Sequence, residues 1–187
     1  MSAHSETWPR PHRLTVDEYY RMAEVGLLSP GDRTELIEGE IVDMPPIGSR
    51  HAAAVTLLAK RMIHALGDSA DLRIQFPVRF LPRSEPQPDI ALVKYRSDGY
   101  RKAHPTAGDT LLLIEVSDST LRYGLEVKAR LYATHVILEY WVVDLVNRRV
   151  VRHRAPSGAQ YAQVDEITAG TVELPVGEIE IDLSDLW

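Results

Sequence analysis

The chain of 187 residues is 44% hydrophobic and holds no cysteine, so it can bury a substantial core but can form neither disulfides nor thiolate metal sites. No apolar stretch approaches the roughly 20 residues of a membrane helix, and residues 1–13 are polar, which predicts a cytoplasmic, single-domain protein (1–187) without a membrane partner. The net charge of -6 argues against a nucleic-acid partner. However, seven acidic residues and no basic residue follow Arg154, so residues 1–154 hold 21 basic residues against 27 minus 7, or 20, acidic residues. The main body of the chain is therefore near neutral, and the negative charge lies in the C-terminal section.

The N-terminal third is predicted to form a helix, a hairpin and a second helix. Thr15 has the capping-box spacing that opens a helix, which we expect to reach about residue 28. Residues 35–44 alternate apolar and charged side chains around Gly39, which predicts a short hairpin or a bulged strand. Ser49 is then predicted to cap an amphipathic helix that the next glycine ends.

The middle of the chain is predicted to hold sheet strands. Residues 72–81 form a strand candidate with Pro77, so part of it is expected at an edge or a bulge. Residues 90–93 and 111–116 are continuous apolar runs, typical of strands buried on both faces. A basic, tyrosine-containing loop over 94–107 joins these two strands.

The last third is predicted to add one helix and several strands. We expect a helix over 121–135, strands over 139–145 and 150–154, and short antiparallel strands in the acidic section 156–187. Together the elements predict an α/β fold of the mixed α+β kind, with a central mixed sheet, flanking helices and additional antiparallel strands at the C-terminal end.

Glu115 interrupts the apolar run 111–116 and needs a partner. An ionised carboxylate in such a strand costs several kcal/mol unless a cation, a metal or hydrogen-bond donors compensate it. Asp89 opens the neighbouring strand candidate, so two acidic side chains are expected on adjacent central strands. Two carboxylates converging with Lys128 form an oxygen-ligand site for Mg2+, which suits metal-assisted hydrolysis of a phosphodiester.

The order and spacing of these residues resemble a large bacterial family described as putative restriction endonucleases, whose members look like PD-(D/E)XK nucleases. The similarity covers roughly residues 14–155 and rests on Pro88-Asp89, Ile114-Glu115-Val116-Ser117, Lys128 with Tyr132, Glu139-Tyr140-Trp141-Val142-Val143-Asp144, Glu35 to Glu40, and His51 ahead of a helix. The resemblance implies a restriction endonuclease-like fold, dependence on Mg2+ with Mn2+ as a substitute, no nucleotide cofactor, and cleavage of DNA.

The resemblance also implies a role for each matched residue. Asp89 and Glu115 match the metal-binding acids, assisted by the backbone carbonyl of Val116. Ser117 occupies the position where the superfamily keeps its lysine, and Lys128 on the following helix is implied to replace it. A lysine on a neighbouring helix can still reach the same water or phosphate, where it would position the water and offset charge in the transition state.

Two further candidates and three departures complete the comparison. Glu35 matches an acid that the superfamily supplies from its N-terminal element, and His51 is an accessory candidate whose simpler interpretation is a hydrogen bond at the helix start.

Gly124 stands where an Asp usually lies four residues before the lysine, so the lysine lacks a helical partner. Val136 and Leu138 replace a Gly and a Pro, and because β-branched residues disfavour the left-handed cap we expect a differently built junction. These departures leave the activity of the site open.

The basic loop and the acids also have plain structural interpretations. Lys94, Arg96, Arg101 and Lys102 are candidates for contacts with DNA phosphates, but a solvated surface loop fits equally well. Asp89 could simply begin a strand and accept backbone hydrogen bonds. Glu115 could form a structural ion pair with the lysine.

Three functions follow from these alternatives. We favour a Mg2+-dependent endodeoxyribonuclease; the others are a catalytically inactive DNA-binding or assembly protein with the same fold, and a metal-dependent hydrolase of a small phosphoester. A homodimer is also expected, because cutting both strands favours two-fold symmetry, with the apolar C-terminal strands and Trp187 as its interface.

Overall fold

A six-stranded mixed sheet forms the centre of the protein, for which a computed structural model describes residues 9–29 and 31–187. The first eight residues of the polar N-terminal segment lie outside that range. In chain order the strands are β3 (Ala70–Ile74), β4 (Ile90–Lys94), β5 (Thr110–Ser117), β6 (Glu139–Asp144), β7 (Arg149–Ser157) and β8 (Gln160–Ile167). Spatial neighbours follow the same order and pair antiparallel, except that β5 and β6 are parallel, so the predicted mixed sheet is confirmed.

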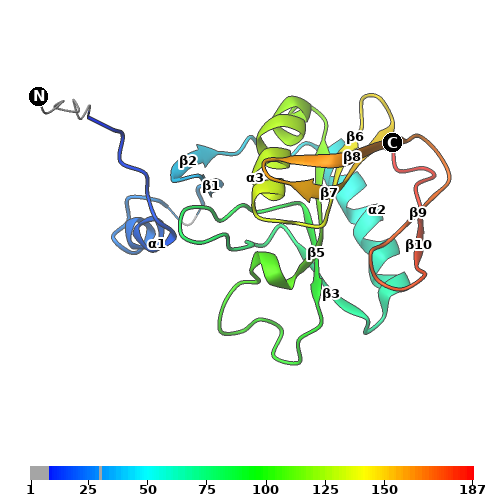
Figure 1. Ribbon diagram of the computed structural model, residues 1–187, viewed down its shortest axis with the longest axis horizontal. Coiled ribbons are helices and arrows are strands. Elements are labelled where there is room, and N and C mark those ends of the chain that lie inside the picture. The colour runs from blue at the N-terminus through cyan, green and yellow to red at the C-terminus, as the bar shows by residue number, and fades with distance from the viewer. Residues whose placement is uncertain (1–8, 30) are drawn as a thin grey trace, which may run out of the picture.

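The remaining elements flank this sheet (Figure 1). They are α1 (Val16–Glu24), the hairpin of β1 (Thr34–Ile37) and β2 (Glu40–Asp43), α2 (Ser49–Leu66), a 3-10 turn (Ala107–Asp109), a π-helical turn (Tyr123–Lys128), α3 (Ala129–Thr134), and the hairpin of β9 (Thr171–Glu173) and β10 (Glu180–Asp182). In Figure 1, α1 and the β1–β2 hairpin stand to the left of the main body. None of the helices in the described part of the chain is long and apolar enough to cross a membrane.

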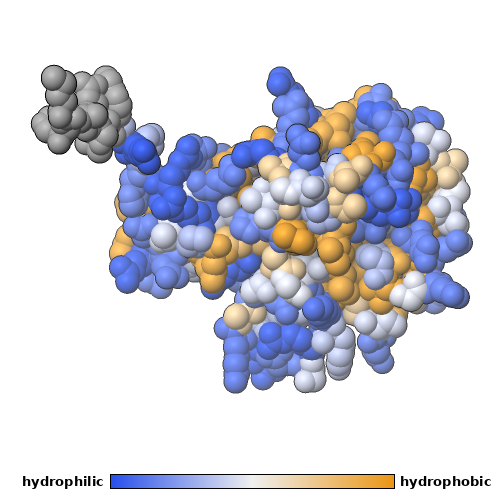
Figure 2. All heavy atoms as spheres, in the orientation of Figure 1, coloured by the Kyte–Doolittle hydropathy of each residue, from blue (hydrophilic) through white to orange (hydrophobic). Residues whose placement is uncertain are grey.

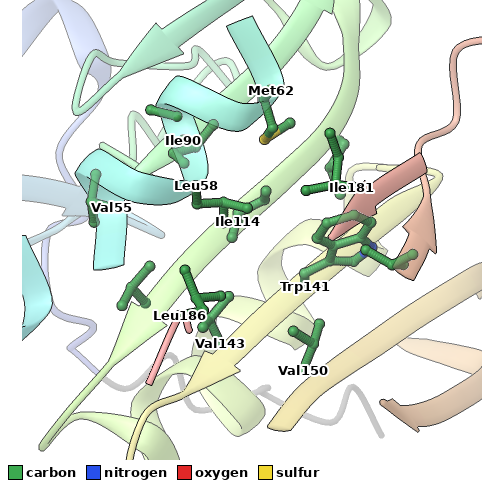
Figure 3. Packing of buried hydrophobic residues seen from close by; sticks show 14 of the residues in the cluster. Val55, Leu58, Met62, Ile90, Ile114, Trp141, Val143, Val150, Ile181 and Leu186 are labelled. Atoms are coloured by element: carbon green, nitrogen blue, oxygen red, sulfur yellow. The ribbon is translucent and has the colours of Figure 1, made fainter. Parts of the chain in front are cut away.

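The core has two parts, one on each face of the sheet. On one face α2 and the C-terminal segment cover the sheet, and Figure 3 shows the packing of Val55, Leu58, Met62, Ile90, Ile114, Trp141, Val143, Val150, Ile181 and Leu186. On the other face α3 packs with the segment around Phe80. The sheet is therefore covered on both sides, which explains the continuous apolar runs of β4 and β5.

The C-terminal hairpin contributes its apolar residues to this core. Val172, Leu174, Ile181 and Leu183 are each at most 2% exposed, and Trp187 packs against the same cluster. These side chains are used inside the chain, so they are not free to form the predicted dimer interface, which stays a prediction.

The first two helices follow the sequence prediction with small shifts. Thr15 forms the predicted capping box, but α1 ends at Glu24 because Gly26 takes a φ of 78° just beyond it. Ser49 is the first residue of α2 and not its cap, since Gly48 holds the cap position without a side-chain hydrogen bond.

Two later elements differ more. The strand predicted over 72–81 ends at Ile74, because Gln75 takes a φ of 54° and breaks the extended run; β3 does lie at an edge of the sheet. The helix predicted over 121–135 is a π-helical turn followed by α3. A π-turn inside a helix is often found at functional sites, and this one carries Lys128.

The junction between α3 and β6 has the left-handed cap that the sequence analysis predicted it would avoid. Val136 takes a φ of 59°; its N–H donates to the Ala133 carbonyl (2.9 Å) and the N–H of Ile137 donates to the Tyr132 carbonyl (3.0 Å). This is the hydrogen-bond pair of a Schellman cap. The expectation of a differently built junction is wrong: the cap is retained, and a β-branched residue is strained into it.

Val136→Gly is therefore expected to stabilise the protein by about 1 kcal/mol. Glycine removes a left-handed penalty of roughly 1–2 kcal/mol and loses part of that gain through the greater freedom of the unfolded chain. Val136 is 63% exposed, so little buried area is lost. Urea unfolding measures the change, and Val146→Gly, at a valine that is 60% exposed without a positive φ, is the matched control. A Val136→Gly protein less stable than wild type would contradict the strain.

Candidate active site

A cavity of about 220 Å³ gathers the residues that the sequence singles out. Its lining includes Glu35 of β1, His51 of α2, Asp89 just before β4, Glu115 of β5 and Lys128 at the end of the π-turn. These residues come from five segments spread over 94 positions of the chain (128 minus 35, plus one). The structure thus brings together the five side chains predicted to be catalytic, metal-binding or accessory.

Lys128 is the buried centre of a three-residue charge cluster. Its Nζ lies 2.6 Å from Glu35 Oε2 and 3.0 Å from Glu115 Oε1. The side chains of Lys128 and Glu35 are each 1% exposed, and that of Glu115 is 14% exposed. Tyr132 also donates its hydroxyl to Glu115 Oε1 at 2.7 Å. Lys128 therefore finds its acidic partners on two strands, β1 and β5, and not at position 124 of its own helix.

Glu115 has an unusual titration because of where it lies. Burial raises its pKa to about 7; the charge of Lys128 opposes that shift, and the nearby carboxylates of Asp89 and Glu35 add to it. For Lys128 the balance is reversed: burial would lower the pKa, but Glu115 and Glu35 outweigh it and raise the pKa above the usual value. A proton or a cation at Glu115 therefore relieves an excess of negative charge in the cavity.

Asp89 is held by donors from three directions. Its Oδ2 accepts the backbone N–H of Val116 (2.8 Å) and lies 3.0 Å from His51 Nε2, while its Oδ1 accepts the side-chain amide of Gln75 (3.2 Å). The hydrogen bond to Asp89 raises the pKa of His51. His51 thus lies at the helix start, as predicted, and its contact is with a candidate metal ligand.

Three residues of the site escaped the sequence analysis. Gln75 holds Asp89, the backbone N–H of Gln87 donates to Glu35 Oε1 at 2.9 Å, and Tyr123 lines the cavity beside Lys128. Gln87 stands directly before the Pro-Asp pair, and this position could have indicated that it belongs to the site. Gln75 offered none, because its role depends on a positive φ.

Gly124 lies on the cavity wall beneath two residues of β6. Its carbonyl accepts the Tyr140 hydroxyl at 3.0 Å, and a Cβ built there would meet that hydroxyl and a Val142 methyl, both at 3.5 Å. The substitution of the usual Asp leaves the cluster around Lys128 complete. Gly124 therefore gives no structural reason to expect an inactive site.

The basic loop does not reach this cavity, and none of its four candidate residues lines it. Lys94 Nζ donates to the Gly108 carbonyl (2.7 Å), and Arg96 pairs with Asp98 at 2.8 Å. Arg101 and Lys102 are exposed. The loop forms the hydrophilic projection at the bottom of Figure 2.

The donor set fits a hydrated cation better than a protein-only metal cage. Within residues 9–29 and 31–187, no three Asp, Glu or His side chains are grouped closely enough to hold a metal by themselves. Mg2+, however, binds through one or two carboxylates and keeps several waters or substrate phosphates. Asp89, Glu115 and Val116 line one cavity with room for such ligands.

The comparisons with known proteins agree with this fold. One solved structure, described as a putative nuclease belonging to DUF820 from Anabaena variabilis, has a TM-score of 0.70 and 17% identity over 92% of this chain and 97% of that chain, which shows a shared fold. No curated protein matches the chain. The model of the Uma2 family, described as "Putative restriction endonuclease", matches residues 16–183. Because that match spans nearly all of the sequence, this chain belongs to the Uma2 family.

Proposed function

We propose that this protein is a Mg2+-dependent endodeoxyribonuclease. The observation that carries the proposal is the shared cavity of Asp89 and Glu115 beside the buried ammonium of Lys128. Two carboxylates with a cation are what metal-assisted phosphodiester hydrolysis needs. Membership of a family described as putative restriction endonucleases supports a nuclease role.

In the proposed reaction the acids would bind the metal and Lys128 would position water or phosphate. Asp89 and Glu115, with the carbonyl of Val116, would hold Mg2+, which when bound polarises the phosphate and lowers the pKa of water. Lys128 would fix the orientation of Glu115 and offer N–H donors to the attacking water or to a phosphate oxygen. Glu35, whose Oε2 lies 2.6 Å from the Lys128 Nζ, would help to keep the ammonium charged and in place.

The surrounding side chains would position the acids. His51 and Gln75 hold Asp89, and the Tyr132 hydroxyl holds Glu115. In the reaction the water oxygen forms a bond to phosphorus, the bond from phosphorus to one sugar oxygen breaks, and the proton of the water is lost to solvent or to that leaving oxygen. Arg101 and Lys102 stay candidates for phosphate contacts, whereas Lys94 and Arg96 already have partners.

The test is cleavage of supercoiled plasmid with Mg2+, with Mn2+ and with a chelator. Nicked or linear product that needs the metal supports the proposal. DNA binding that weakens with salt, without product in any metal, would favour the inactive binding protein. Hydrolysis of a small nitrophenyl phosphodiester with intact DNA would favour the small-substrate enzyme. A cytoplasmic location, which the lack of cysteine suggests, stays a prediction.

Mg2+ binding is expected to release a proton from Glu115 and to strengthen as the pH rises. The folded-state pKa of Glu115 is about 7, so below that pH the proton competes with the metal, and each further unit down weakens apparent binding by up to about tenfold. Calorimetry at about pH 6 and about pH 8.5, in buffers of different ionisation heat, measures how many protons are released when Mg2+ binds. Glu115→Gln should abolish the release, and an apparent affinity that does not change with pH would contradict the prediction.

A further inference from the structure

β3 leaves one side of the sheet open. Its inner side pairs with β4, and no strand within residues 9–29 and 31–187 pairs with its outer side. The N–H of Gln75 donates to the Asp89 carbonyl (3.0 Å), which makes 75 and 89 a hydrogen-bonded pair. Because such pairs alternate along an antiparallel ladder, the N–H and carbonyl groups of Ala70, Leu72 and Ile74 point outward.

The sequence of β3 is complementary to itself when two copies run antiparallel. We propose that this edge binds a second copy of the chain, with a two-fold axis at Leu72. In that register Leu72 faces its own copy, Ala70 faces Ile74, and Asp71 faces Arg73. All outward-pointing backbone groups of the strand then find partners, and each copy places an acid opposite a base.

Asp71 and Arg73 of the two copies face each other at the positions where the two proposed strands approach most closely. Residues 71 and 73 fall at the non-hydrogen-bonded positions of the new ladder, where facing Cα atoms approach to about 4.5 Å. Arg73 lies over the rings of Phe76 (5.1 Å) and Tyr100 (5.7 Å), and its Nε is buried without a hydrogen-bond partner. Asp71 uses one oxygen for the N–H of Arg96 (3.0 Å). A carboxylate from the second copy would give the Arg73 guanidinium an ionic partner.

An apolar groove beside β3 supplies the rest of the interface. It lies between α2 and β3 and is lined by Val55, Thr56, Ala59, Lys60, Ile63, His64 and Ile74. Ile63 is 56% exposed and Ile74 is 36% exposed. A two-fold axis through a continuous sheet stands normal to it, so both α2 helices lie on the same face. The groove and Ile63 of each copy then lie on the same face as those of the other copy, as an isologous interface requires.

The opposite edge of the sheet lacks these features. The charged residues of β8 are both acidic, Asp165 and Glu166, and both already pair with arginines of β7. No register of β8 with a second β8 places an acid opposite a base. The pairing we propose is therefore specific to β3, and it does not depend on nuclease activity.

Light scattering of the full chain tests this directly. We expect twice the 21.0 kDa mass of one chain at micromolar concentration. Arg73→Asp puts acid opposite acid twice and should weaken association by about tenfold or more, whereas Asp71→Arg with Arg73→Asp restores opposite charges and should restore the dimer. Arg148→Asp, on an exposed turn, is the matched control, and thermal unfolding verifies that each variant folds.

A single introduced cysteine gives the second measurement, since the chain has none of its own. Leu72→Cys would face itself across the axis at a Cα separation near 5.5 Å, within disulfide range, and should give a covalent dimer on mild oxidation. Val164→Cys, 53% exposed on β8, should give no covalent dimer under the same oxidation. A monomer at tens of micromolar would overturn the proposal. So would a dimer that tolerates Arg73→Asp and does not cross-link through position 72.

Discussion

Glu115→Gln is expected to lower metal-dependent DNA cleavage by at least about 100-fold while the protein stays folded. Glutamine keeps the shape of the side chain and its contact with the Tyr132 hydroxyl, but it removes the negative charge that a divalent cation needs. Plasmid cleavage under single-turnover conditions measures the loss. Asp89→Asn should have a similar effect, since Asp89 lines the same cavity.

The pH dependence of the stability of the Glu115→Gln protein gives an independent test of the raised pKa of Glu115. The folded pKa of Glu115 is raised to about 7 from an unfolded value of 4.5, so the stabilisation from this group is complete below pH 4.5 and is lost as pH rises through 7. Glutamine does not titrate, so the variant should gain stability relative to wild type between these two pH values. Glu126→Gln, on the exposed face of the π-turn, is the matched control for both readouts. Cleavage at the wild-type rate by Glu115→Gln would refute the proposed metal site.

Lys128→Met is expected to destabilise the protein by about 3–5 kcal/mol near neutral pH. Methionine fills much of the same volume, but it leaves Glu35 and Glu115 buried next to each other without a cation. Removing one partner from a buried charge cluster leaves an uncompensated charge, which is why the loss exceeds that of a surface ion pair. Urea unfolding at several pH values measures it.

Acid should reduce this loss, because protonation of Glu115, whose pKa burial raises to about 7, removes one of the two uncompensated charges. We therefore expect the deficit of Lys128→Met to shrink between pH 8 and pH 5, and Glu35→Gln in the same chain to recover part of it. A loss below about 1 kcal/mol at neutral pH would mean that water reaches the cluster and screens it. Arg122→Met, at an exposed arginine paired with Glu126, should cost almost nothing.

The sequence predicted the central strands and the acids well because burial leaves a local signature. An apolar run interrupted by one Glu, and a Pro-Asp pair ahead of a second run, are readable without knowledge of the fold. Both residues lie where the pattern indicated, in or next to neighbouring strands of the sheet. Family resemblance then singled out Lys128, which alone would pass as a surface residue of a helix.

Other features depend on contacts that no local pattern encodes. The pairing of Lys128 with Glu35 joins residues 93 positions apart (128 minus 35), so the loss of an i,i+4 partner at Gly124 was misleading. The π-helical turn and the positive φ of Gln75 are likewise set by tertiary packing. Val136 shows the converse case, since the hydrogen bonds of a cap fix a conformation that the residue itself disfavours.

The contact between Glu35 and Lys128 also joins two parts of the molecule that the chain does not keep together. Glu35 belongs to the small β1–β2 hairpin, whereas Lys128 belongs to the main body, and Figure 1 shows the hairpin at the side of that body. Any opening of the hairpin removes an anion from Lys128 and exposes the ammonium to water. Local fluctuation of the β1–β2 hairpin is thus coupled to the arrangement of the charged groups around Lys128. If the protein is the nuclease proposed above, we expect it to lose activity on heating before its sheet unfolds, so that its temperature optimum depends on the attachment of the hairpin.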